Sequence, residues 1–313
     1  MTRPKFPPRL GFIELPYSQG QSLFTNLAIY HAIGHVVYEE FSTLDRPHPA
    51  FAALDAATLR ALNGVFSKDY EDRETFALGA EIIENWTREV FCDLFAIRLV
   101  GPAFSFALVE ILGMLGSLSP RERVKFDHEH PASALRFAEH VEILRDDSWW
   151  DAIADIDPAQ KRLLQELAQI PRAQYRFYSD DKKLSRRGLV NAFLKSIVPA
   201  IRNLVRRVTP EAKPAAKRFR RAREAIEDCL SVGVVPHTNT SSSPDPVSII
   251  NSAFCFYLTA LPKIVAKFEG TAAERDVEIR SKWTKKLEDW TMKAIEDSQV
   301  RSQFERTRRD GSF

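Results

Sequence analysis

Residues 73–102 read R-E-T-F-A-L-G-A-E-I-I-E-N-W-T-R-E-V-F-C-D-L-F-A-I-R-L-V-G-P, and this stretch decides the fold. Apolar residues recur along it at helical spacing, which predicts one long helix from about Arg73 to Val100. Gly101-Pro102 ends that helix, because glycine suits a helix C-terminus and proline suits the first turn of a new helix. Helical periodicity continues on both sides of the stretch.

The rest of the chain is also predicted to be mainly α. One strand is expected, at Gly11 to Pro16 (G-F-I-E-L-P). Two parts are predicted, residues 1–175 and a helical extension over 176–313, because one apolar pattern ends near 175–185. Further helices are expected at about 21–41 and 55–66, from just after Pro131, and at about 158–170, 186–207, 210–230, 247–268 and 272–304.

Within the extension, residues 232–246 (V-G-V-V-P-H-T-N-T-S-S-S-P-D-P) are too rich in serine, threonine and proline to pack a core. They are interpreted as a loop or lid.

The composition is that of an ordinary globular protein. The 313 residues are 44% hydrophobic and 27% charged, and a net charge of +2 favours no partner class. Three scattered cysteines without a C-x-x-C pair exclude a disulfide framework and favour a reducing, cytoplasmic setting. The first residues lack the apolar core of a signal peptide. The apolar stretch from Leu99 to Leu118 is interrupted by Gly101-Pro102 and Glu110, so a buried helix is expected there and no membrane span.

Two histidines stand out in the helix predicted at 21–41. His31 and His35, in H-A-I-G-H, are four residues apart, the spacing that places two imidazoles on one helix face to share a metal. In zinc peptidases a glutamate follows the first histidine and activates the water on the metal. This chain has Ala32 at that position. Histidine pairs at this spacing also arise by chance, so the pair alone is a weak signal.

A second segment, E-V-F-C-D at 89–93, strengthens the case for a metal. Glu89 and Asp93 are also four apart, on a helix whose neighbouring residues are apolar. Carboxylates on a core-facing side are costly unless they are paired or bind a metal. Two histidines and Glu89 would give Zn2+ three protein ligands and leave a fourth position open. Asp93 could then accept a ring N–H from one histidine and fix its tautomer.

A third segment, H-P-A-S-A-L-R at 130–136, places His130 before a helix and Arg136 inside it. A histidine and an arginine close to a polarised carbonyl could stabilise a developing oxyanion. His48, His128, His140 and His237 are interpreted as ordinary surface or loop histidines, with His128 as a potential substitute ligand.

In this order the three segments resemble the motifs of the gluzincin metallopeptidases, most closely the branch of the heat-shock membrane protease and the CAAX prenyl protease. That branch has H-E-x-x-H, then E-x-x-x-D, then H-P with an arginine shortly after. The resemblance covers about residues 25–140 and implies a helical metallopeptidase core. The activity that it implies is that of a zinc-dependent endopeptidase with a polypeptide substrate. It implies His31, His35 and Glu89 as zinc ligands and Asp93 as the acid that orients a histidine.

Two departures from that family are clear. The transmembrane helices of the branch are missing, and Ala32 replaces the general base, whose loss typically lowers the rate about 10²–10⁴-fold or more. The chain as written is therefore expected to be inactive or nearly so. Both a natural pseudopeptidase and a deliberately inactivated variant would carry H-A-I-G-H.

The sequence leaves functions other than a peptidase open. A ferritin-like di-iron bundle needs E-x-x-H on two helices, and none occurs here. A basic stretch at 202–223 could recruit a nucleic acid or an acidic protein, although a solvated face balanced by acidic neighbours is the expected interpretation. A purely structural alternative also exists, in which the four polar side chains on apolar helix faces form a buried network without a metal: His31, His35, Glu89 and Asp93. A pseudopeptidase acting as a zinc-stabilised binding protein remains the alternative function.

Overall fold

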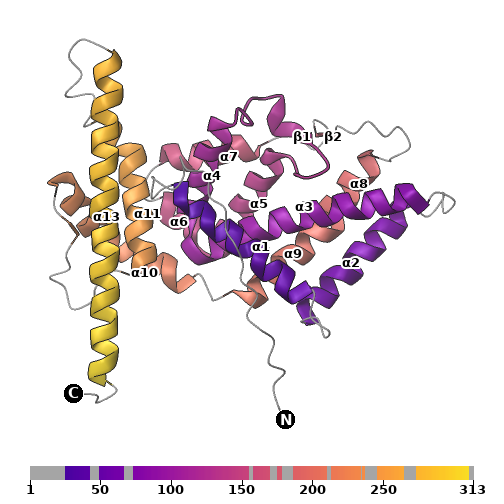
Figure 1. The fold of residues 1–313 in the computed structure, drawn as a ribbon, viewed down its shortest axis with the longest axis horizontal. Coiled ribbons are helices and arrows are strands. Elements are labelled where there is room, and N and C mark those ends of the chain that lie inside the picture. Colours follow the sequence, from indigo (N-terminus) through magenta and orange to yellow (C-terminus); the bar gives the residue numbers. More distant parts are fainter. Residues whose placement is uncertain are drawn as a thin grey trace.

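The computed structural model describes residues 25–42, 49–66, 73–154, 158–169, 175–177, 186–209, 213–233, 235–236, 245–263 and 273–309. Within them the chain is mainly α-helical, as predicted (Figure 1). Two residue pairs form a minimal parallel sheet, Lys125 with Arg176 and Phe126 with Phe177. The strand predicted at 11–16 and most of the loop predicted at 232–246 lie outside the described residues.

The described helices and strands follow one another in this order: η1 (Thr25–Leu27), α1 (Ala28–Ser42), α2 (Pro49–Phe66), α3 (Arg73–Val100), α4 (Pro102–Met114), η2 (Glu122–Val124), β1 (Lys125–Phe126), α5 (Ser133–Asp146), α6 (Trp149–Ala154), α7 (Pro158–Ala168), β2 (Arg176–Phe177), α8 (Arg186–Ala192), the π-helical turn η4 (Phe193–Ile197), α9 (Val198–Val208), α10 (Lys213–Ser231), α11 (Pro246–Thr259) and α13 (Ala273–Arg309).

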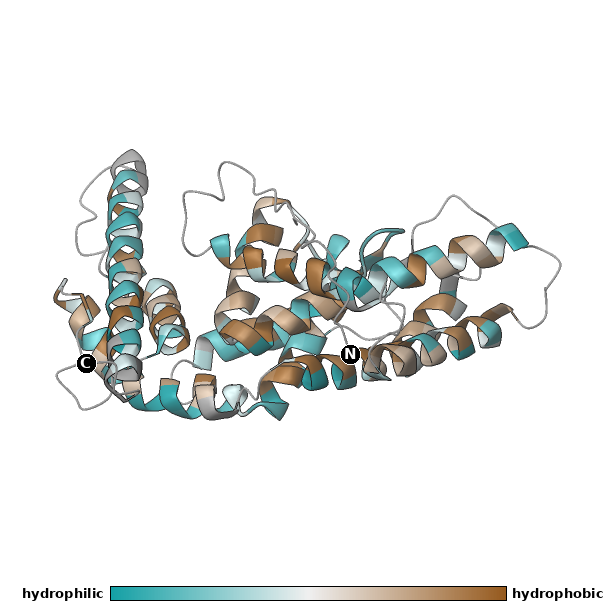
Figure 2. Ribbon diagram, turned by 60° about the horizontal axis from the view of Figure 1, so that its bottom comes forward, coloured by the Kyte–Doolittle hydropathy of each residue, from teal (hydrophilic) through white to brown (hydrophobic). Residues whose placement is uncertain are grey.

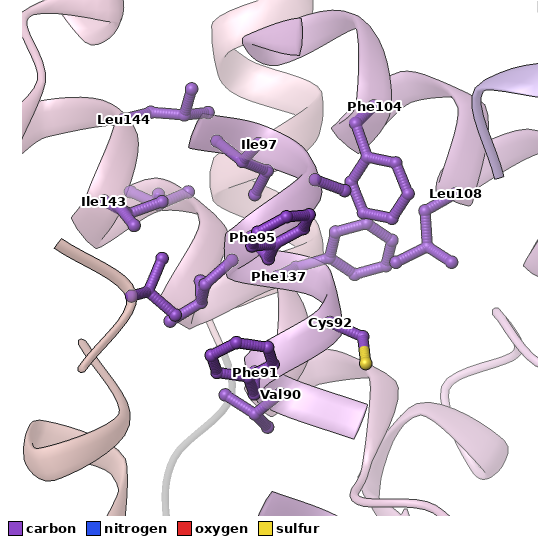
Figure 3. Packing of buried hydrophobic residues seen from close by; sticks show 14 of the residues in the cluster. Val90, Phe91, Cys92, Phe95, Ile97, Phe104, Leu108, Phe137, Ile143 and Leu144 are labelled. Atoms are coloured by element: carbon purple, nitrogen blue, oxygen red, sulfur yellow. The ribbon is translucent and has the colours of Figure 1, made fainter. Parts of the chain in front are cut away.

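Helix α3 is the centre of the core. Every residue from Val90 to Arg98 is buried, because α1, α4, α5 and α9 all pack against this part of α3. A helix that is enclosed on all sides needs apolar residues all round, and the run V-F-C-D-L-F-A-I supplies them with one acidic exception, Asp93. Figure 3 shows Phe91, Phe95 and Ile97 of α3 among the aromatic and aliphatic side chains of α4 and α5.

Helices from both sides of the predicted boundary near residue 175 share one hydrophobic core. Helix α9 packs on α2 and α3, and α10 packs on α6 and α11. Helix α13 lies beside α11 at one end of the molecule (Figure 1). It is mostly hydrophilic, in contrast to the apolar central helices (Figure 2).

The segment predicted as one helix at 186–207 contains a π-helical turn between α8 and α9. Pro199 lies in the first turn of α9 and has no N–H to donate to the preceding turn, which accounts for the change in helical pitch. Helix α6 was not predicted. It is six residues long, too short to show a periodicity, and it follows a sharp turn at Ser148, whose φ is 65°.

The break between α3 and α4 is built as the Gly101-Pro102 pair predicts. Gly101 has a φ of 73°, and a Cβ there would lie 2.9 Å from a ring carbon of Trp149. Asn251 of α11 satisfies the two helix ends: its amide nitrogen donates to the Val100 carbonyl oxygen at 2.8 Å, and its amide oxygen accepts from the Ala103 N–H at 2.8 Å. One side chain thereby replaces the hydrogen bonds that both helices lack at the break. No helix of the described residues is long and apolar enough to cross a membrane.

Replacing Asn251 with leucine should lower the free energy of unfolding by about 2–4 kcal/mol, because it leaves two buried backbone groups unsatisfied. The neighbouring Ser252 is the matched control, since its hydroxyl is buried but has no hydrogen-bond partner among the described residues. Ser252→Ala should therefore cost less than about 1 kcal/mol. Urea unfolding of both variants measures the difference, and equal costs would contradict the capping role of Asn251.

Candidate metal centre

The site begins where α1 crosses α3, and Gly34 permits the crossing. A Cβ on Gly34 would lie 2.9 Å from the Cα of Cys92 and 3.2 Å from its sulfur. Real Cβ atoms are not found this close to backbone carbon, so only glycine lets the two helices approach as they do. The close crossing carries His31 and His35 on α1 over Glu89 and Asp93 on α3.

Replacing Gly34 with alanine should therefore destabilise the protein by about 1–3 kcal/mol through overpacking. Gly64 of α2 offers a matched control, because a Cβ there would meet no atom within 4 Å. Gly64→Ala should stabilise the helix by about 0.5–1 kcal/mol. Thermal or urea unfolding gives both values. Stabilisation by Gly34→Ala would mean that the helices do not cross as described.

The three ligands predicted for zinc lie together. His31 Nε2 is 3.1 Å from His35 Nε2, and Glu89 places Oε2 3.5 Å from the first nitrogen and Oε1 3.3 Å from the second. Atoms bound at about 2.0–2.1 Å to a tetrahedral zinc lie about 3.3–3.4 Å from one another. The spacing among these nitrogens and oxygens thus fits one small divalent cation, and the donor set is one that zinc prefers.

Beneath the histidines, Asp93 is the buried centre of a charged network. Its Oδ1 lies 2.8 Å from His31 Nδ1, which leaves His31 Nε2 free to point at Glu89 and His35. Arg136 of α5 donates to both Asp93 oxygens, at 2.6 and 2.7 Å, in a two-pronged pair. The same arginine nitrogen that binds Oδ1 lies 3.5 Å from Glu89 Oε2. Arg136 is therefore occupied in holding the two carboxylates.

The electrostatics of the network keep its acids ionised. Burial alone would raise the pKa of Glu89, but hydrogen bonds from His31 and His35 and the charge of Arg136 outweigh it and lower that pKa. The pKa of Asp93 is likewise held well below its usual range, because Arg136, His140 and His31 outweigh the effect of burial. Burial opposes protonation of His31, yet Asp93 and Glu89 raise its pKa to about 9. Glu89 and Asp93 are thus ionised and paired with Arg136 and a protonated His31, and a metal that takes His31 Nε2 as a ligand displaces a proton from it.

His140 is a part of this network that the sequence interpretation placed wrongly. It is fully buried rather than a surface or loop histidine, and its Nε2 lies 3.4 Å from Asp93 Oδ2. Burial lowers its pKa, so it is neutral. A sequence signal for it existed: Arg136 and His140 are four residues apart on α5, the same spacing as the paired residues on α1 and α3. Three helices each contribute one such pair.

Cys92 is a second candidate ligand that the sequence interpretation did not consider. Its sulfur and one nitrogen from each of His31 and His35 lie within 4.8 Å of one another. In Figure 3 this sulfur projects from α3 away from Ile143 and Leu144. Burial and the nearby carboxylates raise the pKa of the Cys92 thiol well above its usual value. Cys92 is an alternative third ligand for the histidine pair, beside Glu89.

A cavity of about 390 Å³ opens beside the centre, and His31, Glu89 and Arg136 line part of it. His130 lines the same cavity and is half exposed; its Nδ1 lies 3.6 Å from Asp127 Oδ1. Asp127 raises the pKa of His130. Ala28, one helical turn before Ala32, also faces the cavity. His130 is thus beside the ligands without contacting them.

Among the remaining histidines, His128 lies in the part of the chain that the structure describes, and its backbone carbonyl oxygen accepts a hydrogen bond from the Asn85 amide. His48 and His237 lie outside the described residues.

The basic stretch at 202–223 is balanced by acids in the described structure, in keeping with the expected solvated face. Four of its arginines have acidic partners: Arg202 with Glu139, Arg206 with Asp146, Arg218 with Asp245, and Arg223 with Glu227.

No protein-family model matches the chain, and neither does any curated protein or solved structure.

Proposed function

We propose that this chain binds one Zn2+ ion through His31, His35 and Glu89, and that its site is that of a zinc-dependent endopeptidase lacking the general base at position 32. The observation that carries the proposal is the separation of 3.1–3.5 Å among the two Nε2 atoms and the Glu89 oxygens. Zinc held in such a site supplies Lewis-acid chemistry, lowering the pKa of water and polarising a carbonyl group.

The remaining residues of the site support this proposal by positioning. Asp93 accepts from His31 Nδ1 and thereby fixes the tautomer that presents Nε2 as a ligand. Arg136 compensates the charge of Asp93, holds it in place from α5 and lies 3.5 Å from Glu89. His130 lies in the same cavity as Glu89, where it could donate a proton to the oxygen of a bound peptide.

Ala32 decides what the site does in the chain as written. A methyl group cannot accept a proton from water or pass one to a leaving amine. A polypeptide could therefore occupy the cavity without being cleaved, and this favours the second candidate function, a zinc-stabilised pseudopeptidase that binds its partner.

Metal analysis tests the ligand set. The purified protein should contain close to one zinc per chain, because Ala32 removes no ligand. Glu89→Gln should lose most of the zinc, whereas Cys92→Ser, three residues further along the same helix, should keep it. The reverse order would make Cys92 the third ligand. No zinc in the unchanged protein, even after incubation with excess zinc, would overturn the proposal in favour of a structural polar network.

A further inference from the structure

His140 is a costly residue in the place where it lies. Its side chain is fully buried on α5. The rings of Phe104 and Phe137, both labelled in Figure 3, lie against it with centroids 5.8 and 5.5 Å away. Nδ1 of His140 has no hydrogen-bond partner among the described residues. A buried polar atom without a partner is unfavourable, so an aliphatic side chain would suit this part of the core better than a histidine.

The contacts of Asp93 explain why a histidine stands there. An ionised carboxylate has about four positions at which it accepts hydrogen bonds. Arg136 takes one position on each oxygen, and His31 Nδ1 takes the second position on Oδ1, at 2.8 Å. On Oδ2 the corresponding neighbour is His140, whose Nε2 lies 3.4 Å away. This distance is longer than that of an ordinary hydrogen bond, so the contact is weak and its loss should have a moderate effect.

We propose that His140 is a positioning residue of the metal centre, which holds the Asp93 carboxylate so that Oδ1 stays on His31 Nδ1 and His31 Nε2 stays on the metal. The two histidines lie on different oxygens of Asp93, and Arg136 bridges both oxygens. The carboxylate is therefore held at each oxygen. This inference rests on the proposed function, because the effect of His140 reaches the zinc through Asp93 and His31.

Three substitutions at position 140 of the full chain test the inference. A glutamine can place its amide nitrogen where histidine has Nε2, an asparagine places its own near the position of Nδ1, and a leucine has no donor. His140→Gln should therefore bind zinc as tightly as the unchanged protein. His140→Asn and His140→Leu should bind it about tenfold more weakly, at the lower end of the effect that outer partners of a ligand have. Competition with a coloured zinc chelator measures the affinities.

Urea unfolding of the same variants without zinc separates positioning from packing. His140→Leu should unfold at nearly the same urea concentration as the unchanged protein, because leucine removes the unpaired Nδ1 and still fills the space beside Phe104 and Phe137. A histidine that only packs would behave differently: the zinc affinity of each variant would fall in step with the stability of its zinc-free form.

Three results would overturn the inference: equal zinc affinity of His140→Leu and the unchanged protein, a His140→Gln form as weak as His140→Leu, or affinity losses that follow the losses of zinc-free stability. If His140→Leu does not fold, the comparison of His140→Gln with His140→Asn decides. Zinc binding by the unchanged protein separates the two claims. Equal affinities of all forms with zinc bound overturn only the inference, whereas an unchanged protein that binds no zinc overturns the proposed function.

Discussion

Replacing Ala32 with glutamate is expected to create peptide-bond hydrolysis that a zinc chelator abolishes. Residue 32 follows His31 on α1 and lies one turn beyond Ala28, which lines the cavity. A carboxylate there would stand beside the ligands on the cavity side of the helix, where a base is needed to take a proton from water. A positioned general base is worth about 10²–10⁴-fold in rate, so the change should be readily measured.

The design of this experiment follows from the unknown substrate. New protein termini would be mapped across the proteome of cells that express the alanine or the glutamate form. Ala32→Gln is the matched control, because glutamine has nearly the same size as glutamate but its amide cannot act as a base. Ala32→Glu combined with His35→Ala tests the need for the metal. Cleavage by the Gln form, or by the form without His35, would count against the mechanism. An inert glutamate form with zinc bound would mean that binding is the function.

The second large effect is expected on stability. Arg136→Met should lower the free energy of unfolding by about 3–5 kcal/mol, because Asp93 is buried and would lose the charge that compensates it. Arg145→Met, on the same helix, is the control: Arg145 is half exposed and pairs with the exposed Glu142, so its loss should cost about 1 kcal/mol or less. Urea unfolding compares the two.

A double variant makes the test more specific. If Arg136 acts through Asp93, then Arg136→Met combined with Asp93→Leu should be less destabilised than the sum of the single changes, because no unpaired charge stays buried. Strict additivity, or a cost for Arg136→Met as small as for Arg145→Met, would show that the pair does not hold the site.

The sequence was most informative where one physical requirement dominated. The helix from Arg73 to Val100 and its end at Gly101-Pro102 were predicted correctly, because long apolar periodicity and a glycine-proline pair leave few alternatives. The spacing placed His31 and His35 on one helix face and Glu89 and Asp93 on another, and the resemblance to the metallopeptidase motifs gave the expectation that the two faces meet.

Features that depend on contacts between distant segments could not be predicted in the same way. Whether His140 is buried depends on how α5 packs against α3: its four-residue spacing from Arg136 places both on one helix face but does not tell which neighbour that face meets. The close approach of Gly34 and Cys92 likewise depends on how two helices cross. Arg136 was predicted to face an oxyanion, but its contacts are with Asp93 and Glu89, which only the folded arrangement reveals.

The position of a bound metal tests the central claim most directly. A crystal of the zinc-loaded protein, measured on both sides of the zinc absorption edge, should show one anomalous peak among His31 Nε2, His35 Nε2 and the Glu89 carboxylate, at about 2.0–2.2 Å from each. A peak bonded to the sulfur of Cys92 in place of Glu89, or no peak between α1 and α3 at saturating zinc, would contradict it.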